Sequence, residues 1–509
     1  MAGSQGEFPK PPPLVPFISP NAFPNTLPYQ PSLLWPFLLL RRTLLRLLQS
    51  GLLIWVALSI TSVYALIVYD RPLIRGDGVA YLAWVDTLTL DGDIDLANQA
   101  EKFQSTNTYQ IVWYADTGKY VTVFPFGAAF LQAPFYKLGD IFYHQGWWNQ
   151  NPEYFRQMQG VAQSYSLWLM IGANSMALGA VLLAWRVGRQ LTGNGMAAFV
   201  AFVFLIGTPL IYYSTTTPLN SHNPGAFMCA CFIYLLSRAT GGIIPDQNPA
   251  QTSSNRFRAW LWVGLGISAG LMILSRWQLL LIALPAWGLL AYQRQWKGAI
   301  LAGVVTAISL LPLPIFWDYL FNQPLTVPYD TVEKQSFFSP PIHAWDVLQM
   351  TILHSPVILL SVFGLFFLWR INRAWAYFCG VAIGLQILIN GAALDWNAGD
   401  SFGMRRMTEL YPIFVVAACA LLGNKHALSP FKPTHFRWIV TRVVLITFIP
   451  LALLYIHAFY VYTWSDQGRF ADTPQRMIQF YLDHPYRAEF EEAASKAHIG
   501  PDSWAKPGP

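Results

Sequence analysis

Long runs of apolar residues recur along most of this chain, separated by short polar segments. A helix that crosses a bilayer needs about 20 predominantly apolar residues, and the pattern predicts about eleven such helices. They lie near 50–69, 162–185, 196–215, 223–237, 259–275, 278–293, 298–317, 351–369, 374–394, 407–422 and 443–463. The predicted fold class is therefore an all-α polytopic membrane protein.

Basic residues mark every second loop between these runs, which predicts the orientation of the chain. Cytoplasmic loops carry an excess of Lys and Arg, and the amino terminus is therefore expected in the cytoplasm. The residues concerned are Arg41, Arg42, Arg46, Arg186, Arg189, Arg238, Arg256, Arg258, Arg294, Lys297, Arg370, Arg373, Lys425, Lys432, Arg437 and Arg442. Residues 70–160 and the tail beyond the last run are expected on the extracytoplasmic side.

This orientation divides the chain into three parts. Residues 1–40 are rich in Pro and predict a disordered cytoplasmic tail. Residues 41–465 are expected to form one transmembrane domain, the candidate for any catalytic role, and residues 466–509 a short extracytoplasmic tail. Within the large first outer loop, segment 124–144 is apolar but interrupted by Pro125 and Pro134. It predicts helices that lie in the membrane interface and roof a cavity.

Composition agrees with this class. Hydrophobic residues make up 54% of the chain and charged residues 11%, whereas soluble domains have about 25% charged residues. The net charge of +6 is accounted for by the cytoplasmic loops, so no nucleic-acid partner is expected. Four cysteines lie in apolar runs without metal-ligand spacing, which indicates packing rather than a disulfide or a zinc site.

The most informative polar stretch follows the first apolar run. Its carboxylates are Asp77, Asp86, Asp91, Asp93, Asp95 and Glu101. Asp77 lies between two glycines, and a carboxylate beside a bilayer marks a site of chemistry or ion binding. It is a candidate general base, and the alternative is a helix N-cap for the segment from Val79 to Leu88.

The run Asp91–Gly92–Asp93–Ile94–Asp95 could chelate a divalent cation, because hard cations take oxygen ligands at alternating spacing. The remaining ligands of an EF-hand loop are missing. A solvated turn is the favoured interpretation.

A second polar group follows the ninth apolar run and contains Asp395, Trp396, Asp400, Arg405, Arg406 and Glu409. Two adjacent arginines on the outer side violate the usual charge bias, so an anion should hold them there. The phosphate of a polyprenyl carrier suits guanidinium groups. The alternative is pairing of the arginines with Asp400 and Glu409.

His222 and Arg276 are expected at the same membrane level as Asp77. His222 is either a packed histidine or a site residue. Arg276 either binds the carrier phosphate or extends its charge to the interface. The chain has no P-loop, dinucleotide fingerprint, HExxH or GxSxG motif, which leaves nucleotide-driven transport, dinucleotide redox and common hydrolase chemistry without support.

Taken in order, these segments resemble the GT-C superfamily of integral-membrane glycosyltransferases, especially its bacterial mannosyltransferase-like or lipid-A-sugar-transferase-like branch. The resemblance covers about residues 50–465. Its matching segments are RGDGVAYL, DGDIDLAN, FPFGAAFLQAPF, PLNSHNPGAFMCACFIYLL, GLGISAGLMILSRWQLLLIALP and DWNAGDSFGMRRMTELYP.

The resemblance implies an inverting hexosyl- or pentosyltransferase with a polyprenyl-phosphate-linked sugar as donor and a lipid, glycan or protein as acceptor. Asp77 corresponds to the catalytic base, and the sugar is expected near Trp113, Tyr114 and Trp396. Because no second acid follows Asp77 at Asp-x-Asp or Asp-x-Glu spacing, no cofactor and no obligatory metal are expected. The implied location is a bacterial inner membrane.

A transporter or flippase of a lipid-linked intermediate is the alternative function. Transporters place polar groups near the bilayer midplane in broken helices. Here the predicted spans are largely uncharged at their centres and the acids gather at one face, which favours interfacial catalysis.

Overall fold

Helices dominate the part of the chain that the structure describes. The computed structural model describes residues 76–104, 109–146, 163–215, 217–244, 255–397, 402–423, 439–440 and 443–454. The predicted first span, both predicted tails and Asp400 lie outside these residues. All described residues belong to one compact unit of the chain, 51–509.

The first outer loop folds into short helices and a small hairpin. Its elements are α3 (Asp77–Asp86), the wide turn η1 (Thr87–Asp91), α4 (Ala97–Lys102), β1 (Val112–Tyr114), β2 (Lys119–Val121) and α5 (Gly127–His144). The two strands are antiparallel, with Trp113 opposite Tyr120. Trp84 of α3 lies at the centre of this region, 1% exposed, and its Nε1 donates to the carbonyl oxygen of Phe124 at 3.0 Å.

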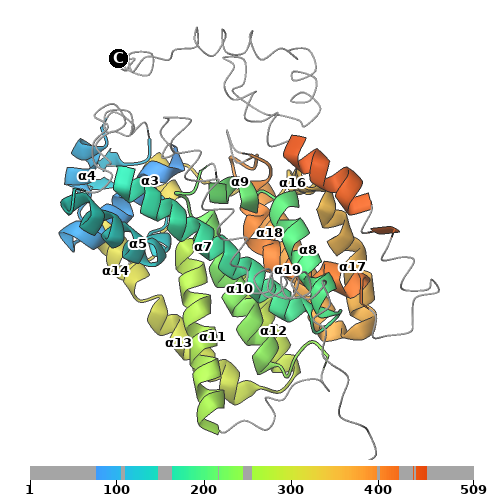
Figure 1. Ribbon diagram of the computed structural model, residues 1–509. Coiled ribbons are helices and arrows are strands. Elements are labelled where there is room, and N and C mark those ends of the chain that lie inside the picture. The colour runs from blue at the N-terminus through green and yellow to red at the C-terminus, as the bar shows by residue number, and fades with distance from the viewer. Residues whose placement is uncertain are drawn as a thin grey trace, which may run out of the picture. The chain divides into compact units, whose positions relative to one another are not determined.

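The remaining helices form the bundle seen in Figure 1. They are α7 (Gln163–Gly188), α8 (Asn194–Gly207), α9 (Leu210–Thr215), α10 (His222–Ala239), α11 (Asn255–Ser275), η4 (Trp277–Leu279), α12 (Leu280–Tyr292), α13 (Trp296–Ser309), α14 (Pro312–Phe321), α15 (Pro328–Glu333), α16 (Ala344–His354), η5 (Pro356–Ile358), α17 (Leu359–Ile371), α18 (Arg373–Ala392), η6 (Arg405–Leu410), α19 (Tyr411–Leu421) and η7 (Val444–Phe448).

Small residues hold the centre of the bundle together. Helix α7 packs against α5, α8, α10 and α19, and its Ala177, Ala180 and Ala184 are fully buried. Such residues let helix backbones approach closely where lipid supplies no hydrophobic driving force.

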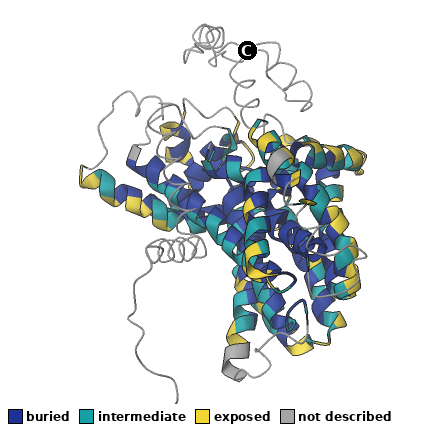
Figure 2. Cartoon of the chain, turned by 45° about the vertical axis from the view of Figure 1, so that its right-hand side comes forward, coloured by how far each residue is buried: buried dark blue, intermediate teal, exposed yellow. Residues whose placement is uncertain are grey.

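Large apolar side chains lie exposed on the outer helices. Ile300 and Ile308 of α13, Ile315 of α14 and Phe363 and Phe366 of α17 are all more than half exposed. Figure 2 shows buried positions in the middle of the bundle and exposed ones on its outer helices. Exposed apolar surface of this extent is costly in water but suits contact with lipid.

The predicted apolar runs that lie in the described part of the chain become helices, but their lengths differ from the prediction. By length and composition, three helices of the described chain could cross a membrane: 164–188, 296–321 and 373–392. A fourth is obtained if the pair 344–354 and 356–371, which bends by 104°, counts as one span. The expected number of about eleven is therefore not confirmed.

Two of the predicted runs are divided or bent at a proline, whereas a third proline lies inside a continuous helix. Run 196–215 divides into α8 and α9 at Thr208–Pro209, and run 351–369 begins inside α16 and bends at Ser355–Pro356. A proline disfavours helical geometry at the preceding residue. Segment 124–144 is the opposite case, because α5 continues through Pro134, and the expected interruption there is wrong.

Three of the described basic loops lie at the opposite end of α10 from the predicted outer site. At one end Gln190 donates to Ser237 at 2.8 Å and Asn372 donates to the carbonyl oxygen of Ile243 at 2.9 Å, next to the basic positions. At the other end lie Asp77 and the start of α10 at His222. Since α10 has 18 residues, the two ends are about 27 Å apart.

We expect Trp84→Ala to destabilise the outer region by about 3–5 kcal/mol, because it removes a fully buried ring and its hydrogen bond. Thermal unfolding of the purified protein in detergent measures this loss. Trp113→Ala is the matched control, since Trp113 is 58% exposed on β1. Equal loss in both variants would show that Trp84 does not support this region.

Candidate active site

Asp77 is the first residue of α3, where the chain turns sharply into the helix. Gly76 enters this turn with φ of +55°, a conformation that residues with a Cβ rarely adopt. Gly76 holds the N-cap position and Asp77 is the first residue inside the helix, with its carboxylate directed to other side chains. The alternative interpretation as a helix N-cap is therefore wrong.

The carboxylate of Asp77 forms an ion pair with Arg405. Arg405 Nη1 lies 2.7 Å from Asp77 Oδ2, and each side chain is about one-fifth exposed. The hydroxyl of Tyr109 donates to Asp77 Oδ1 over a longer distance of 3.4 Å. Both oxygens of the predicted base thus have a donor, and one of these donors is a predicted phosphate-binding arginine.

Burial and nearby negative charge act on Arg405 in opposite directions. Burial alone would lower the pKa of its guanidinium, but Asp77, Tyr213, Tyr81 and Asp395 together raise the pKa above the ordinary value, with Asp77 the largest of these four. The ion pair therefore stabilises the charged form of Arg405.

Tyr81 connects this ion pair to the interior. It lies one helical turn after Asp77, and its hydroxyl is 2.8 Å from Ser221 Oγ. Burial raises the pKa of Tyr81 to about 12, although the nearby charge of Arg276 partly offsets the effect. Tyr81 therefore keeps its proton at neutral pH and can donate a hydrogen bond.

A buried group of Arg276, His222 and Glu409 lies beyond Ser221. Glu409 Oε1 is 2.8 Å from His222 Nδ1 and 3.3 Å from Arg276 Nε, and the Glu409 and His222 side chains are at most 2% exposed. Arg276 Nη1 also donates to Ser221 Oγ at 3.3 Å. The Arg276 side chain is 13% exposed and is enclosed by these partners, so it does not extend its charge to the interface.

Two glutamines hold η6 in place beside this group. Gln278 Nε2 donates to the carbonyl oxygen of Arg406 at 3.2 Å, and Gln386 Nε2 donates to the carbonyl oxygen of Gln278 at 2.7 Å. The turn η4 and helix α18 thereby hold the segment that carries Arg405 and Arg406.

Arg406 belongs to a neighbouring cluster. It forms an ion pair with Asp395 and lies over the ring of Phe337 at 5.9 Å. Trp396 stacks on His343 with ring centroids 4.7 Å apart. The arginines therefore pair with Asp77 and Asp395, rather than with Glu409 as the alternative interpretation had it; Asp400 lies outside the described residues.

Five of the predicted site residues thus lie in one ion pair and one buried group, which share the elements α3 and η6. They are Asp77, Arg405, Arg276, His222 and Glu409. Arg406 and Trp396 lie in the neighbouring cluster instead. Sequence reasoning missed Tyr81, Ser221, Gln278 and Tyr109; helical spacing from Asp77 was an available signal for Tyr81.

The acidic run after α3 is a closed turn. Asp93 Oδ1 accepts from Thr87 Oγ1 at 2.6 Å and from the backbone N of Asp95, while Asp91 accepts from Asn98 and Gln99. Among the described residues, no group of three or more His, Cys, Asp or Glu side chains could hold a metal ion. The favoured interpretation as a turn agrees with these contacts.

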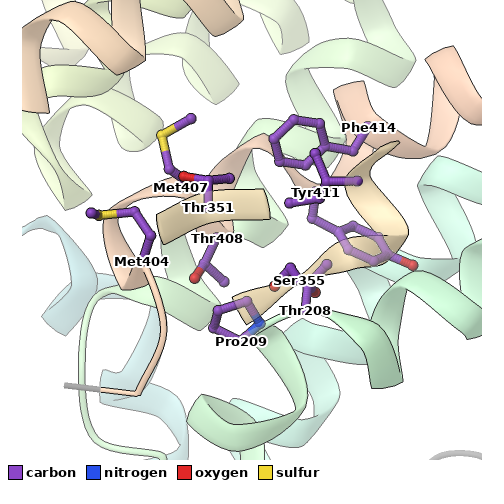
Figure 3. Close-up of a pocket in the computed structure, with 10 residues that line it drawn as sticks. Thr208, Pro209, Thr351, Ser355, Met404, Met407, Thr408, Tyr411 and Phe414 are labelled. Atoms are coloured by element: carbon purple, nitrogen blue, oxygen red, sulfur yellow. The ribbon is translucent and has the colours of Figure 1, made fainter. Parts of the chain in front are cut away.

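A small cavity lies beneath η6, on the side shown in Figure 3. Its volume is about 10 Å³, room for about one water molecule. Its lining residues are Thr208, Pro209, Thr351, Ser355, Ile358, Met404, Met407, Thr408, Tyr411 and Phe414. The cavity is too small to hold a sugar or a phosphate.

No protein-family model matches the chain, and no curated protein matches its sequence. Its structure is similar to that of the archaeal oligosaccharyltransferase AglB from Archaeoglobus fulgidus, solved with an inhibitory peptide and a dolichol-phosphate (TM-score 0.49, 13% identity). It is also similar to the apo form of the oligosaccharyltransferase of the same organism (TM-score 0.46, 12% identity).

Both alignments cover 85% of this chain and 59% of the neighbour, so the chain spans less than two-thirds of their length. Similarity at this level carries no inference about substrate or reaction. Function is therefore inferred from the site itself.

We expect Gly225→Ala to disturb the buried group, because an added Cβ would lie 2.9 Å from Glu409 Cγ. Overpacking of this kind costs about 1–3 kcal/mol, which a lower midpoint of thermal unfolding would show. Gly384→Ala in α18 is the control, since a Cβ there meets nothing within 4 Å. An unchanged midpoint for Gly225→Ala would contradict the tight packing of Glu409 against α10.

Proposed function

We propose that this protein is an integral-membrane glycosyltransferase of the GT-C type. It moves a sugar from a polyprenyl-phosphate donor to an acceptor, with inversion, at the extracytoplasmic face of the membrane. The observation that carries this proposal is the contact between Asp77 and Arg405. A candidate base and a candidate phosphate ligand, from opposite ends of the described chain, meet at 2.7 Å.

The two residues have complementary roles in such a transfer. Arg405 binds the phosphate of the donor and offsets the negative charge that develops on it as the sugar–phosphate bond breaks. Asp77 accepts the proton of the acceptor hydroxyl or amine as this group attacks the sugar from the opposite side. Both side chains reach the surface, so a lipid headgroup and an acceptor can approach them.

The buried group supports this site rather than taking part in the reaction. The guanidinium of Arg276 already contacts Glu409, His222 and Ser221. We therefore assign phosphate binding first to Arg405 and then to Arg406, and we assign to Arg276 the positioning of η6. The half-buried Trp396, with one face on His343, suits contact with a sugar ring.

A flippase or transporter would use the same polar groups differently. Ionisable residues of transporters lie on a path across the bilayer. The described ionic groups of this site gather instead at one end of α10, about 27 Å from the basic end. This favours catalysis at one face over passage through the bundle.

We expect Asp77→Asn to lower sugar transfer by about 10²–10⁴-fold, because the amide keeps the shape but cannot accept a proton. The assay follows release of polyprenyl phosphate from a panel of polyprenyl-phosphate-linked hexoses and pentoses by mass spectrometry. Asp116→Asn, at an exposed turn of the same loop, is the control. Near-normal transfer by Asp77→Asn would overturn the assignment of the base.

The proposed chemistry requires no metal, because Arg405 and Arg406 supply the positive charge beside the phosphate. Transfer by purified protein should therefore be unchanged by excess EDTA and by later addition of Mg²⁺ or Mn²⁺. Loss of activity in EDTA with recovery on Mn²⁺ would refute this part of the proposal. The same transfer assay gives the measurement.

A further inference from the structure

We infer that the Asp77 carboxylate lies where a phosphate oxygen of the sugar donor would bind to Arg405. The phosphate and Asp77 therefore compete for the guanidinium of Arg405. This inference rests on the proposed function. It specifies how the phosphate binds and when the base becomes available.

The first step concerns Asp77 itself. Its Oδ2 is held by Arg405 at 2.7 Å and its Oδ1 faces the hydroxyl of Tyr109. Arg405 takes up part of the hydrogen-bonding capacity of Oδ2 and occupies one side of this oxygen. Opening of this contact therefore gives an acceptor group more room to bond to Oδ2 and pass its proton.

The second step identifies Arg405 as the cation whose partner can exchange. Arg276 is held by Glu409, which has no exposed side-chain surface. The side chain of Arg406 is 9% exposed and that of Arg405 is 20% exposed. Of these three arginines, Arg405 has the guanidinium most accessible to a ligand, and its partner is also at the surface.

The third step compares the two anions. A guanidinium binds phosphate through two parallel hydrogen bonds, and a polyprenyl phosphate brings an oxygen cluster that suits this geometry. Arg405 stays paired before and after the exchange, so no uncompensated buried charge is created. Asp77 is left with the long contact to Tyr109, and its Oδ2 becomes free to accept the acceptor's proton.

A double-mutant cycle tests the competition. The affinity of purified protein in detergent for undecaprenyl phosphate is measured for the wild type, Asp77→Asn, Arg405→Gln and the double variant. Competition predicts that Asp77→Asn tightens binding about tenfold where Arg405 is present and less than twofold where it is Gln, because the coupling belongs to the pair. Asp116→Asn controls for the loss of a remote negative charge.

Each outcome has a distinct meaning. If Asp77→Asn increases the affinity for undecaprenyl phosphate equally with Arg405 and with Gln at this position, Asp77 only repels the phosphate. This result would overturn the competition, while the proposed function stands. If Arg405→Gln binds undecaprenyl phosphate as well as the wild type, Arg405 does not bind the phosphate, and both proposals fail. The double variant lacks both members of the ion pair, so neither charge is left without its partner. Comparison with it shows whether a single variant loses binding through misfolding.

A measurement on the wild type completes the test without substitution. Labelling of Asp77 by a water-soluble carbodiimide, read by peptide mass spectrometry, should rise as undecaprenyl phosphate is added. Its midpoint should match the binding curve. Labelling that stays constant or falls would overturn the competition.

Discussion

The carboxyl group of Glu409 has no exposed side-chain surface, and the arrangement of the site depends on the partners that surround it. A buried ionisable group is costly unless it is paired and hydrogen-bonded. Glu409 meets His222 from the start of α10 and Arg276 from the end of α11. These contacts fix η6 against two helices that are distant in sequence. Arg405 and Glu409 belong to the same short helix, η6, so the contacts of Glu409 also position Arg405 beside Asp77. The buried group of Arg276, His222 and Glu409 thus supports the ion pair between Asp77 and Arg405.

The membrane explains why these groups lie together. Charged side chains within hydrocarbon are expensive, so the chain places them at helix ends and leaves the outer faces of α13, α14 and α17 apolar. Tyr81, on the same helix as Asp77, bonds to Ser221, which also accepts from Arg276 of the buried group. Helix α3 thus contacts both the surface ion pair and the buried group.

The sequence predicted a helical fold, and the structure brings several of the predicted site residues together. The predictions that failed have physical causes. Apolar periodicity located α7 and α18 within a few residues. It could not separate α8 from α9, or reveal the bend at Ser355, because hydropathy records composition and these breaks depend on backbone geometry around proline. The charge pattern predicted that Asp77, His222, Arg276 and Arg405 lie at the same depth relative to the membrane. It could not predict which of these charges pair with one another. Pairing depends on packing distances, and Gly225, which leaves room for Glu409, gives no charge signal.

An active site is usually sought as an empty hollow, and here the cavity beneath η6 holds about one water molecule. The charged groups of Asp77 and Arg405 instead pair with each other. A site closed by its own ion pairs admits a charged ligand by replacement, because the ligand must supply the interaction that it removes. Phosphate can do so for Arg405, whereas a neutral sugar cannot. Under the proposed function, a phosphorylated carrier would be selected by charge compensation at Arg405, before any contact with the sugar is made.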